Sequence, residues 1–354
     1  MKVLITGGAG FLGFHLAKYF SGKKYQVCLV DIQSPDKKEY PKSSVFYKAD
    51  IRDKKSILKI FKSVKPDYIV HAAAALPLAD PDTIFSVNIK GTGNVLYAAK
   101  KTGAKRFIYI SSTAVYGVPT KHPIVESDER VGVGPYGQSK IDAENLCFDY
   151  LEKGLDVTII RPKTFLGTHR LGVFEILFDW IHDGKKIPVI GDGNNRYQLL
   201  EVTDLAEAIY LFLKRSLLPE KKRSNLNGAF NIGTEKFTTV KGDFQIFFKK
   251  VKSKSRILTT PSAVVKKALW IFEKLHLSPL YQWVYDTADK DSFVSIDKLM
   301  STLNWRPKYS NADSLTKAYL WYLKNYREIK SRGTGITHTV GWRQGILSII
   351  KKFM

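Results

Sequence analysis

The chain begins MKVLITGGAGFLGFHL, where Gly7, Gly10 and Gly13 follow directly on the apolar run 3–5. Glycine is favoured where a backbone must bend sharply or approach another group closely. Beyond the glycines, apolar residues recur at helical spacing as far as Phe20. An apolar strand, a G-x-x-G-x-x-G turn and a helix in this order predict a dinucleotide site, because the N–H groups and the dipole at a helix N-terminus favour a diphosphate.

The next apolar run, YQVCLVDI, predicts a second strand that ends at Asp31. A carboxylate about 20 residues beyond such glycines is expected to hold the ribose hydroxyls of NAD and to repel the extra phosphate of NADP. Lys37 and Lys38 lie close by and would attract that phosphate. We therefore expect NAD as the cofactor, with NADP as the less favoured alternative.

Strand-like and helical segments alternate regularly from the N-terminus to Pro162. This alternation predicts an α/β fold with a doubly wound parallel sheet of the Rossmann type. We expect an NAD-binding domain over residues 1–165 plus about 200–233, and a smaller mixed α/β C-terminal substrate domain over about 166–199 plus 234–328. Residues 329–354 would form a C-terminal tail.

Composition excludes several classes of protein. The net charge of +23 comes largely from lysine pairs spread along the chain, which is typical of a solvated surface rather than of a nucleic-acid-binding stripe. Cys28 and Cys147 are the only cysteines, so we expect neither a disulfide framework nor a metal site. No apolar run reaches the about 20 residues of a membrane helix, and the expected compartment is the cytoplasm.

The tail sequence GWRQGILSIIKKFM predicts an amphipathic helix, since Trp342, Ile346, Ile349, Ile350 and Phe353 recur at helical spacing. The favoured interpretation is a helix that docks on its own domain or on a dimer partner. The alternative is a peripheral contact with an anionic membrane.

The residues with acid–base chemistry follow the glycine motif in order. Ser111, Ser112 and Thr113 come at the end of the strand-like run RFIYI, where ligands bind in open parallel sheets. Tyr136 and Lys140 are four residues apart on a predicted helix, which places both on one face. An ammonium beside a phenol stabilises the phenolate and lowers the tyrosine pKa, so this pair predicts general acid–base chemistry with a serine hydroxyl holding the substrate oxygen.

The order of these motifs resembles the extended short-chain dehydrogenase/reductases, the NAD-dependent epimerase/dehydratase family that includes nucleotide-sugar epimerases. The resemblance covers nearly all of residues 1–325 and is carried by TGGAGFLG, HAAA at 71–74, NIKGTGNVL, SSTAVYG, YGQSK, RPKTFLG at 161–167, VTDLAEA and LNWRPKYS. It implies a Rossmann domain, bound NAD and a Ser-Tyr-Lys centre.

The resemblance also implies roles for individual residues. By its place before VYG, Ser112 is the catalytic serine, together with Tyr136 and Lys140. Residues expected at the cofactor are Gly7, Gly10, Phe11, Leu12, Gly13, Asp31, Asp50 and Ile51 at the adenine, Ala72 and Ala73 at the diphosphate, Asn88, Tyr136, Lys140 at the nicotinamide ribose, and Pro162.

The reaction depends on the residues before VYG. Related dehydratases carry Thr-Asp-Glu there and related decarboxylases a glutamate, whereas this chain has Ser112, Thr113 and Ala114. Without those carboxyl groups we expect plain hydride transfer, by an epimerase or by a dehydrogenase. A cofactor-gated scaffold without turnover is a third class, and the complete Ser112, Tyr136 and Lys140 set disfavours it.

The expected substrate residues are Thr113, Thr164, Arg196 and Tyr197. Sugar-nucleotide members usually have Asn where this chain has Thr164, and Arg where it has Tyr197, with Arg196 one residue away and long enough to reach a diphosphate. The favoured prediction is a nucleotide-sugar epimerase resembling UDP-glucose 4-epimerases. The alternative, an oxidoreductase resembling 3β-hydroxysteroid dehydrogenases and acting on an apolar alcohol, fits these departures and the run GNNRYQLLEV.

Relatives of this kind dimerise through two helices, which correspond here to roughly residues 89–101 and 137–152. We therefore expect a homodimer held by a four-helix bundle with two-fold symmetry.

Replacing Asp31 with alanine should weaken NAD binding and improve tolerance of NADP, because the carboxylate that holds the ribose and repels the 2′-phosphate is lost. Titration calorimetry with both cofactors measures the two effects. An unchanged NAD affinity in Asp31→Ala would contradict the assignment of this residue.

Overall fold

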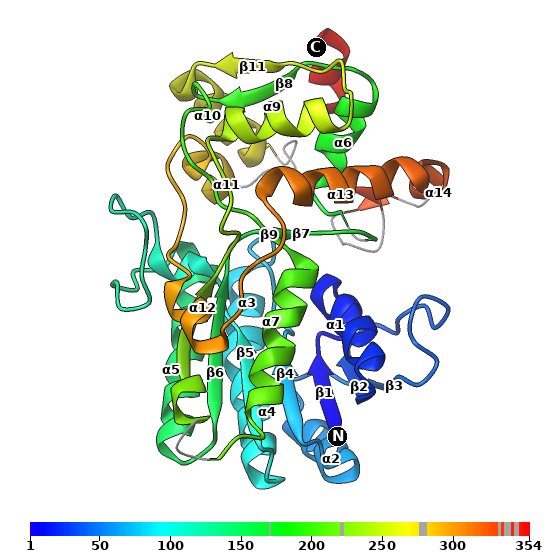
Figure 1. Ribbon diagram of the computed structural model, residues 1–354, viewed down its shortest axis with the longest axis vertical. Helices are drawn as coiled ribbons and strands as arrows, with labels where there is room; N and C mark the ends of the chain where they lie inside the picture. The colour runs from blue at the N-terminus through cyan, green and yellow to red at the C-terminus, as the bar shows by residue number, and fades with distance from the viewer. Residues whose placement is uncertain (170, 220–222, 276–281, 332–333, 336–340, 343–346) are drawn as a thin grey trace.

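The computed structural model describes residues 1–169, 171–219, 223–275, 282–331, 334–335, 341–342 and 347–354. Figure 1 shows two layers of the molecule, with a sheet and its helices in the lower part and a smaller group of helices and short strands above it. The sheet is formed by β1 (Lys2–Thr6), β2 (Gln26–Asp31), β3 (Val45–Lys48), β4 (Tyr68–His71), β5 (Arg106–Ile110), β6 (Val157–Pro162) and β10 (Gly228–Ile232).

All seven strands are parallel, in the order β10-β6-β5-β4-β1-β2-β3. The first three strands are therefore added in one direction, from β1 to β3. The chain then returns to the other side of β1, where β4, β5, β6 and β10 are added in the opposite direction. Because β1 and β4 are neighbours, the order reverses between them, which is the place where doubly wound sheets bind their ligands. The predicted fold class is confirmed.

Helices cover both faces of the sheet, which explains the unbroken apolar run of β1. Val3 and Ile5 point to the face covered by α1 (Phe11–Gly22) and α7 (Val202–Arg215), while Leu4 points to the opposite face. That opposite face is covered by α2 (Lys54–Val64), α4 (Thr92–Lys101) and α5 (Gly134–Glu152).

The helical region between β4 and β5 is divided into three pieces. α3 (Pro81–Phe85) is followed by a π-helical stretch over Ser86–Gly91 and then by α4. Thr92 donates to the carbonyl oxygen of Asn88 (2.6 Å) within this stretch. The π-helical turn widens the helix where Asn88 points inward, which hydrophobic periodicity does not reveal.

The upper group has its own core, which contains Phe178, Phe247 and Tyr322. It is connected to the sheet layer through the short pair β7 (Phe165–Leu166) and β9 (Leu200–Glu201) (Figure 1). The other helices and strands of the whole chain are α6 (Phe174–His182), β8 (Ile187–Ile190), α9 (Val240–Lys250), β11 (Ile257–Thr260), α10 (Ser262–Lys274), α11 (Gln282–Thr287), α12 (Asp297–Leu303), α13 (Asn311–Lys324), α14 (Tyr326–Ser331), β12 (Thr334–Gly335), β13 (Gly341–Trp342) and α15 (Leu347–Ile350). Of these, α12 packs against β10 and α7 in the sheet layer. The exact boundaries of the two predicted domains stay a prediction.

The C-terminal tail differs from the single helix expected for it. Trp342 lies in strand β13, and helix α15 covers only Leu347–Ile350, while Ile346 lies outside the described residues. Ile350 packs against the upper core, and the Lys351 ammonium pairs with the carboxylates of Asp179 (2.5 Å) and Asp183 (2.7 Å). These contacts favour docking on the chain's own upper group. Among the described residues, no helix has the length and apolar character needed to cross a bilayer.

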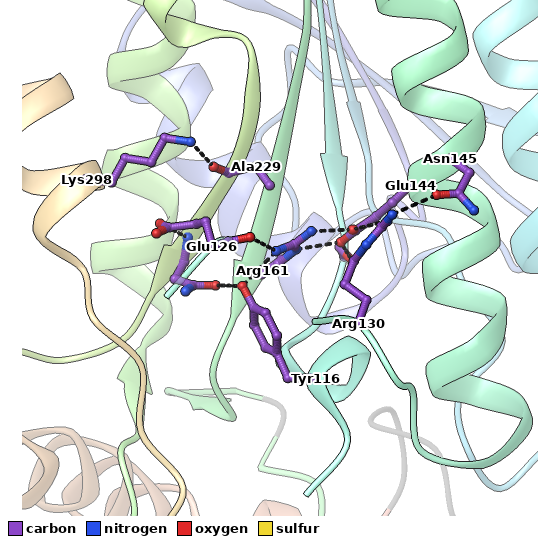
Figure 2. Close-up of polar contacts among 10 residues, drawn as sticks. Tyr116, Glu126, Arg130, Glu144, Asn145, Arg161, Ala229 and Lys298 are labelled. Carbon is purple, nitrogen blue, oxygen red and sulfur yellow. Dashed lines mark hydrogen bonds and ion pairs between the residues drawn. The ribbon is translucent and has the colours of Figure 1, made fainter. Parts of the chain in front are cut away.

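A buried carboxylate, that of Glu144 on α5, joins three elements of the sheet layer (Figure 2). It accepts hydrogen bonds from the Ser111 hydroxyl (2.6 Å), from Arg161 Nε (2.9 Å) and Nη2 (2.6 Å), and from Arg130 Nη1 (3.1 Å). Ser111 follows β5 and Arg161 lies in β6, so the ends of both strands are fixed to α5. The side chains of Glu144 and Arg161 are 0% and 3% exposed.

Arg161 makes two further hydrogen bonds through Nη1. Its Nη1 donates to the Tyr116 hydroxyl (2.7 Å) and to the carbonyl oxygen of Glu126 (3.1 Å), and the Tyr116 hydroxyl donates to Asn231 on β10 (2.7 Å) (Figure 2). A buried charge is tolerated when such partners surround it completely.

Replacing Glu144 with glutamine should lower the free energy of unfolding by about 3–5 kcal/mol, because it leaves the Arg161 cation buried without its counter-charge. Urea denaturation measures this loss. Asp142→Asn, on the same helix but outside the network, is the matched control and should change stability by no more than about 0.5 kcal/mol. A loss below about 1 kcal/mol for Glu144→Gln would contradict the role of this carboxylate.

Candidate functional site

A cleft of about 450 Å³ lies at the carboxyl ends of the sheet strands, beside the neighbouring strands β1 and β4, between which the strand order reverses. It brings together most of the residues predicted for the cofactor and the reaction. Its lining residues from those predictions are Gly7, Gly10, Phe11, Leu12, Gly13, Asp31, Asp50, Ile51, Ala72, Ala73, Ser112, Thr113, Tyr136, Lys140, Pro162 and Thr164.

The glycine turn brings the backbone close to its neighbours, as expected. A Cβ on Gly7, whose φ is +69°, would lie 2.8 Å from the backbone nitrogen of Ala73, and one on Gly13 would lie 2.2 Å from the carbonyl oxygen of Gly7. Gly10 caps α1 without a side chain, so the helix N-terminus is open toward the cleft. This cradle fits a diphosphate, whose charge the N-terminal N–H groups favour.

Asp31 lies beside this cradle at the end of β2. Its Oδ2 accepts from the backbone nitrogen of Ala9 (2.9 Å) and its Oδ1 from that of Gln33 (3.0 Å). Each carboxylate oxygen has a second lone pair, so both keep capacity for a ribose hydroxyl. The residues present therefore fit NAD.

Asp50 and Ile51 form the next part of the wall, together with Arg52, a lining residue that sequence reasoning missed. Arg52 Nη2 contacts Asp50 Oδ2 at 2.6 Å, and this hydrogen-bonded pair lowers the pKa of the Asp50 carboxyl. Asn94 Nδ2 donates to the carbonyl oxygens of Ile51 and Arg52 (both 3.0 Å) and so fixes this turn from behind.

Asn88, which was expected at the cofactor, is not among the residues that line the cleft. It is 1% exposed and lies behind the wall, where its Oδ1 accepts from the nitrogen of Ala75 (2.8 Å) and its Nδ2 donates to Ser139 (2.9 Å). Asn88 thus connects the loop after β4 to helix α5 instead of facing the cavity.

The two serines after β5 point in opposite directions, because side chains alternate along extended backbone. Both residues line the cleft, but the Ser111 hydroxyl donates to Glu144, whereas the Ser112 hydroxyl accepts from the nitrogen of Ala114 (3.1 Å) and lies near enough to Tyr136 to affect its pKa. Of the two, only Ser112 is therefore placed beside the phenol.

Tyr136 and Lys140 lie on α5 and both line the cleft. The Lys140 ammonium donates to the carbonyl oxygen of Ile110 (2.9 Å) and lies 5.8 Å from the centroid of the Tyr136 ring. Burial lowers the pKa of Lys140 to about 8, an effect that the charge of Glu144 opposes.

The expected decrease in the pKa of Tyr136 is not found. Burial raises the pKa of this phenol to about 12, and the hydrogen bond with Ser112 opposes that rise only in part. Desolvation, which disfavours the phenolate, is therefore the larger of the two effects on this group.

The predicted substrate residues are only partly brought together. Thr113 and Thr164 line the cleft, and Thr164 Oγ1 lies 2.9 Å from the hydroxyl of Tyr197. Arg196 is exposed and is not among the lining residues, because its guanidinium lies over the rings of Phe237 (4.8 Å to the centroid) and Phe293 (4.4 Å). The expected position of Arg196 at a diphosphate is therefore not seen.

Lys163 is a second lining residue that sequence reasoning missed, although it is part of the motif RPKTFLG. It directly follows β6 and is 4% exposed. A lysine directly after a strand that ends at the cleft was the available signal. Within the described ranges, no group of three or more His, Cys, Asp or Glu side chains is arranged to hold a metal ion.

Comparison with known proteins agrees with this geometry. Residues 3–233 match the model of the NAD dependent epimerase/dehydratase family. The chain is similar to the uncharacterized protein y4nG of Sinorhizobium fredii, with 33% identity over 98% of this chain and 85% of that protein. It is also similar to a UDP-glucose 4-epimerase of Rhizobium meliloti, with 27% identity over 91% of this chain and 97% of the relative.

Among solved structures, the UDP-glucose 4-epimerase of Thermotoga maritima, determined with UDP-glucose, shares the fold. Its TM-score is 0.75 at 24% identity, over 92% of this chain and 100% of that one. The resemblance noted in the sequence, the enzyme class and NAD as the cofactor are thereby confirmed. The chain belongs to the NAD-dependent epimerase/dehydratase family.

Proposed function

We propose that this protein is an NAD-dependent nucleotide-sugar epimerase whose acid–base centre is Ser112, Tyr136 and Lys140. One observation carries the proposal: a single cleft is lined by the glycine cradle and by all three of these side chains. The UDP-sugar epimerases among its relatives support the substrate class. Ala114, where dehydratases carry an acid, supports hydride transfer without elimination.

In this proposal each side chain has a separate task. The Ser112 hydroxyl holds the reacting oxygen of the sugar, and Tyr136 removes the proton from that oxygen and later returns it. The chemistry that bound NAD would supply is oxidation of the sugar alcohol and reduction of the resulting ketone from the other face. Lys140 keeps a positive charge near the phenol at neutral pH, since its pKa of about 8 leaves it mostly protonated.

The alternative is a dehydrogenase for an apolar alcohol. It is favoured by the position of Arg196, which is not among the residues that line the cleft and would have been the cation for a diphosphate. The two functions differ in the fate of the cofactor. An epimerase uses no net NAD, whereas a dehydrogenase accumulates NADH in proportion to the substrate consumed.

Replacing Tyr136 with phenylalanine should reduce turnover of UDP-glucose by roughly 10²–10⁴-fold without unfolding the protein, because only the acid–base hydroxyl is removed. Product formation is measured by chromatography, with NADH absorbance followed in parallel. Tyr150→Phe, half-buried on the same helix outside the cleft, is the matched control and should retain full turnover.

Wild-type turnover in Tyr136→Phe would overturn the assignment of the acid–base group. Stoichiometric NADH from a hydroxylated lipid, with no conversion of UDP-glucose, would favour the alternative function.

We further propose that the protein is a homodimer formed through α4 and α5. The two helices pack against each other, and apolar side chains on them, among them Tyr97, Leu146 and Phe148, remain only half-buried in the single chain. Pairing with a second copy would remove these side chains from water in a contact with two-fold symmetry.

Analytical ultracentrifugation at micromolar concentration should give the mass of two chains. Leu146→Glu should halve that mass, because it places a charge in the proposed contact. Leu320→Glu, on the exposed face of α13, is the control and should leave the dimer intact. A wild-type protein that sediments as a monomer would reject this assembly.

A further inference from the structure

Lys163 is a buried basic residue that forms no ion pair with the residues the structure describes. Its ammonium donates to the hydroxyl of Ser292 (2.6 Å) and lies 5.0 Å from the centroid of the Tyr197 ring. No ion pair joins Lys163 to a carboxylate in the described part of the chain, although the residue is only 4% exposed. Burying an ammonium in this way is costly unless an anion compensates it.

Two ionisable residues lie near Lys163, namely Asp291 and His122. Asp291 lines a small cavity of about 20 Å³ that Lys163 and Ser292 also line, but its Oδ1 accepts from the backbone nitrogen of Arg196 (2.7 Å). Burial without a compensating carboxylate lowers the pKa of Lys163 to about 7. An anionic ligand would hold the ammonium in its charged form.

Lys163 lies at the reacting end of the cleft rather than at the glycine cradle. It lines the large cleft together with Ser112 and Tyr136, and it shares both the cleft and the adjoining small cavity with Thr113. A group bound by this lysine is therefore attached close to the carbon whose alcohol reacts. A diphosphate is separated from C4 of a hexose by the sugar ring itself, whereas the carboxylate of a hexuronic acid is carried on C5, the neighbouring carbon.

We propose that Lys163 is a specificity-determining residue that binds the carboxylate of an acidic nucleotide sugar, with the Ser292 hydroxyl as its partner. This inference rests on the proposed epimerase function and narrows its substrate class to nucleotide-linked uronic acids. A carboxylate accepts a charge-assisted hydrogen bond from the ammonium and a second one from the hydroxyl, which satisfies the buried cation.

The test compares UDP-glucuronic acid, UDP-glucose and UDP on the NAD-loaded enzyme, with turnover and titration calorimetry as readouts. The wild type should bind UDP-glucuronic acid at least about tenfold more tightly than UDP-glucose. Lys163→Met should lower kcat/KM for UDP-glucuronic acid by about 10- to 100-fold, as expected when a hydrogen bond to a charged group is lost. In the same variant kcat/KM for UDP-glucose should fall by a smaller factor than kcat/KM for UDP-glucuronic acid, so that the preference for the acidic sugar is lost, and the affinity for UDP should change least of the three values.

Two controls accompany this variant. Lys214→Met, exposed on α7, removes a charge outside the cleft and should leave every value unchanged. The melting temperature of ligand-free Lys163→Met should be equal to or above that of the wild type, because a buried unpaired cation is replaced by an apolar chain of similar length.

Each contrary result has a defined meaning. Equal losses on UDP, UDP-glucose and UDP-glucuronic acid would place the lysine at the diphosphate and overturn the inference while leaving the proposed function intact. Equal wild-type affinity for the two sugars, or no effect of Lys163→Met, would also overturn the inference about Lys163 and leave the proposed function intact. Failure of the wild type to bind any of the three uridine ligands would overturn the proposed function and this inference with it.

Discussion

The geometry of the reacting end depends on one buried carboxylate. Glu144 lies on the helix that carries Tyr136 and Lys140, and it accepts hydrogen bonds from Ser111 and Arg161 at the ends of the two adjacent strands. A single group thus fixes the separation of three elements that each supply a wall of the cleft. Buried networks of this kind depend on their hydrogen bonds, and Figure 2 shows the bonds that join Arg161 to Glu144, Glu126 and Tyr116.

The fold and much of the site could be predicted because their signals are local in sequence. The glycine turn, the strand end at Asp31 and the helical spacing of Tyr136 and Lys140 each occupy a few consecutive residues, and the structure brings all of them to one cleft. Tertiary pairings leave no such signal. Glu144 and Arg161 lie on different elements, and only the fold shows that the two side chains meet. The position of Arg196 depends on tertiary contacts in the same way, since its guanidinium lies over two aromatic rings from distant segments, and its role at the substrate stays a prediction.

The pKa values of the ionisable side chains at the reacting end of the cleft depend more on burial than on ion pairing. The spacing of residues in the sequence does not predict that burial. The pKa of Tyr136 is raised and the pKa values of Lys140 and Lys163 are lowered, in each case mainly by desolvation. All three shifts favour the neutral form of the side chain. These three side chains therefore contribute little charge at the reacting end of the cleft. A charged ligand that binds there would change their protonation.

The bond between Lys163 and Ser292 joins residues that are 129 positions apart in the chain. Lys163 follows a sheet strand, whereas Ser292 belongs to the segment between α11 and α12, which returns to the cleft from the upper group. The cofactor cradle is complete within the first strands and is independent of that returning segment. If the proposed role of Lys163 and Ser292 holds, selection can act on this segment to exchange one sugar for another while the machinery of oxidation and reduction is inherited unchanged.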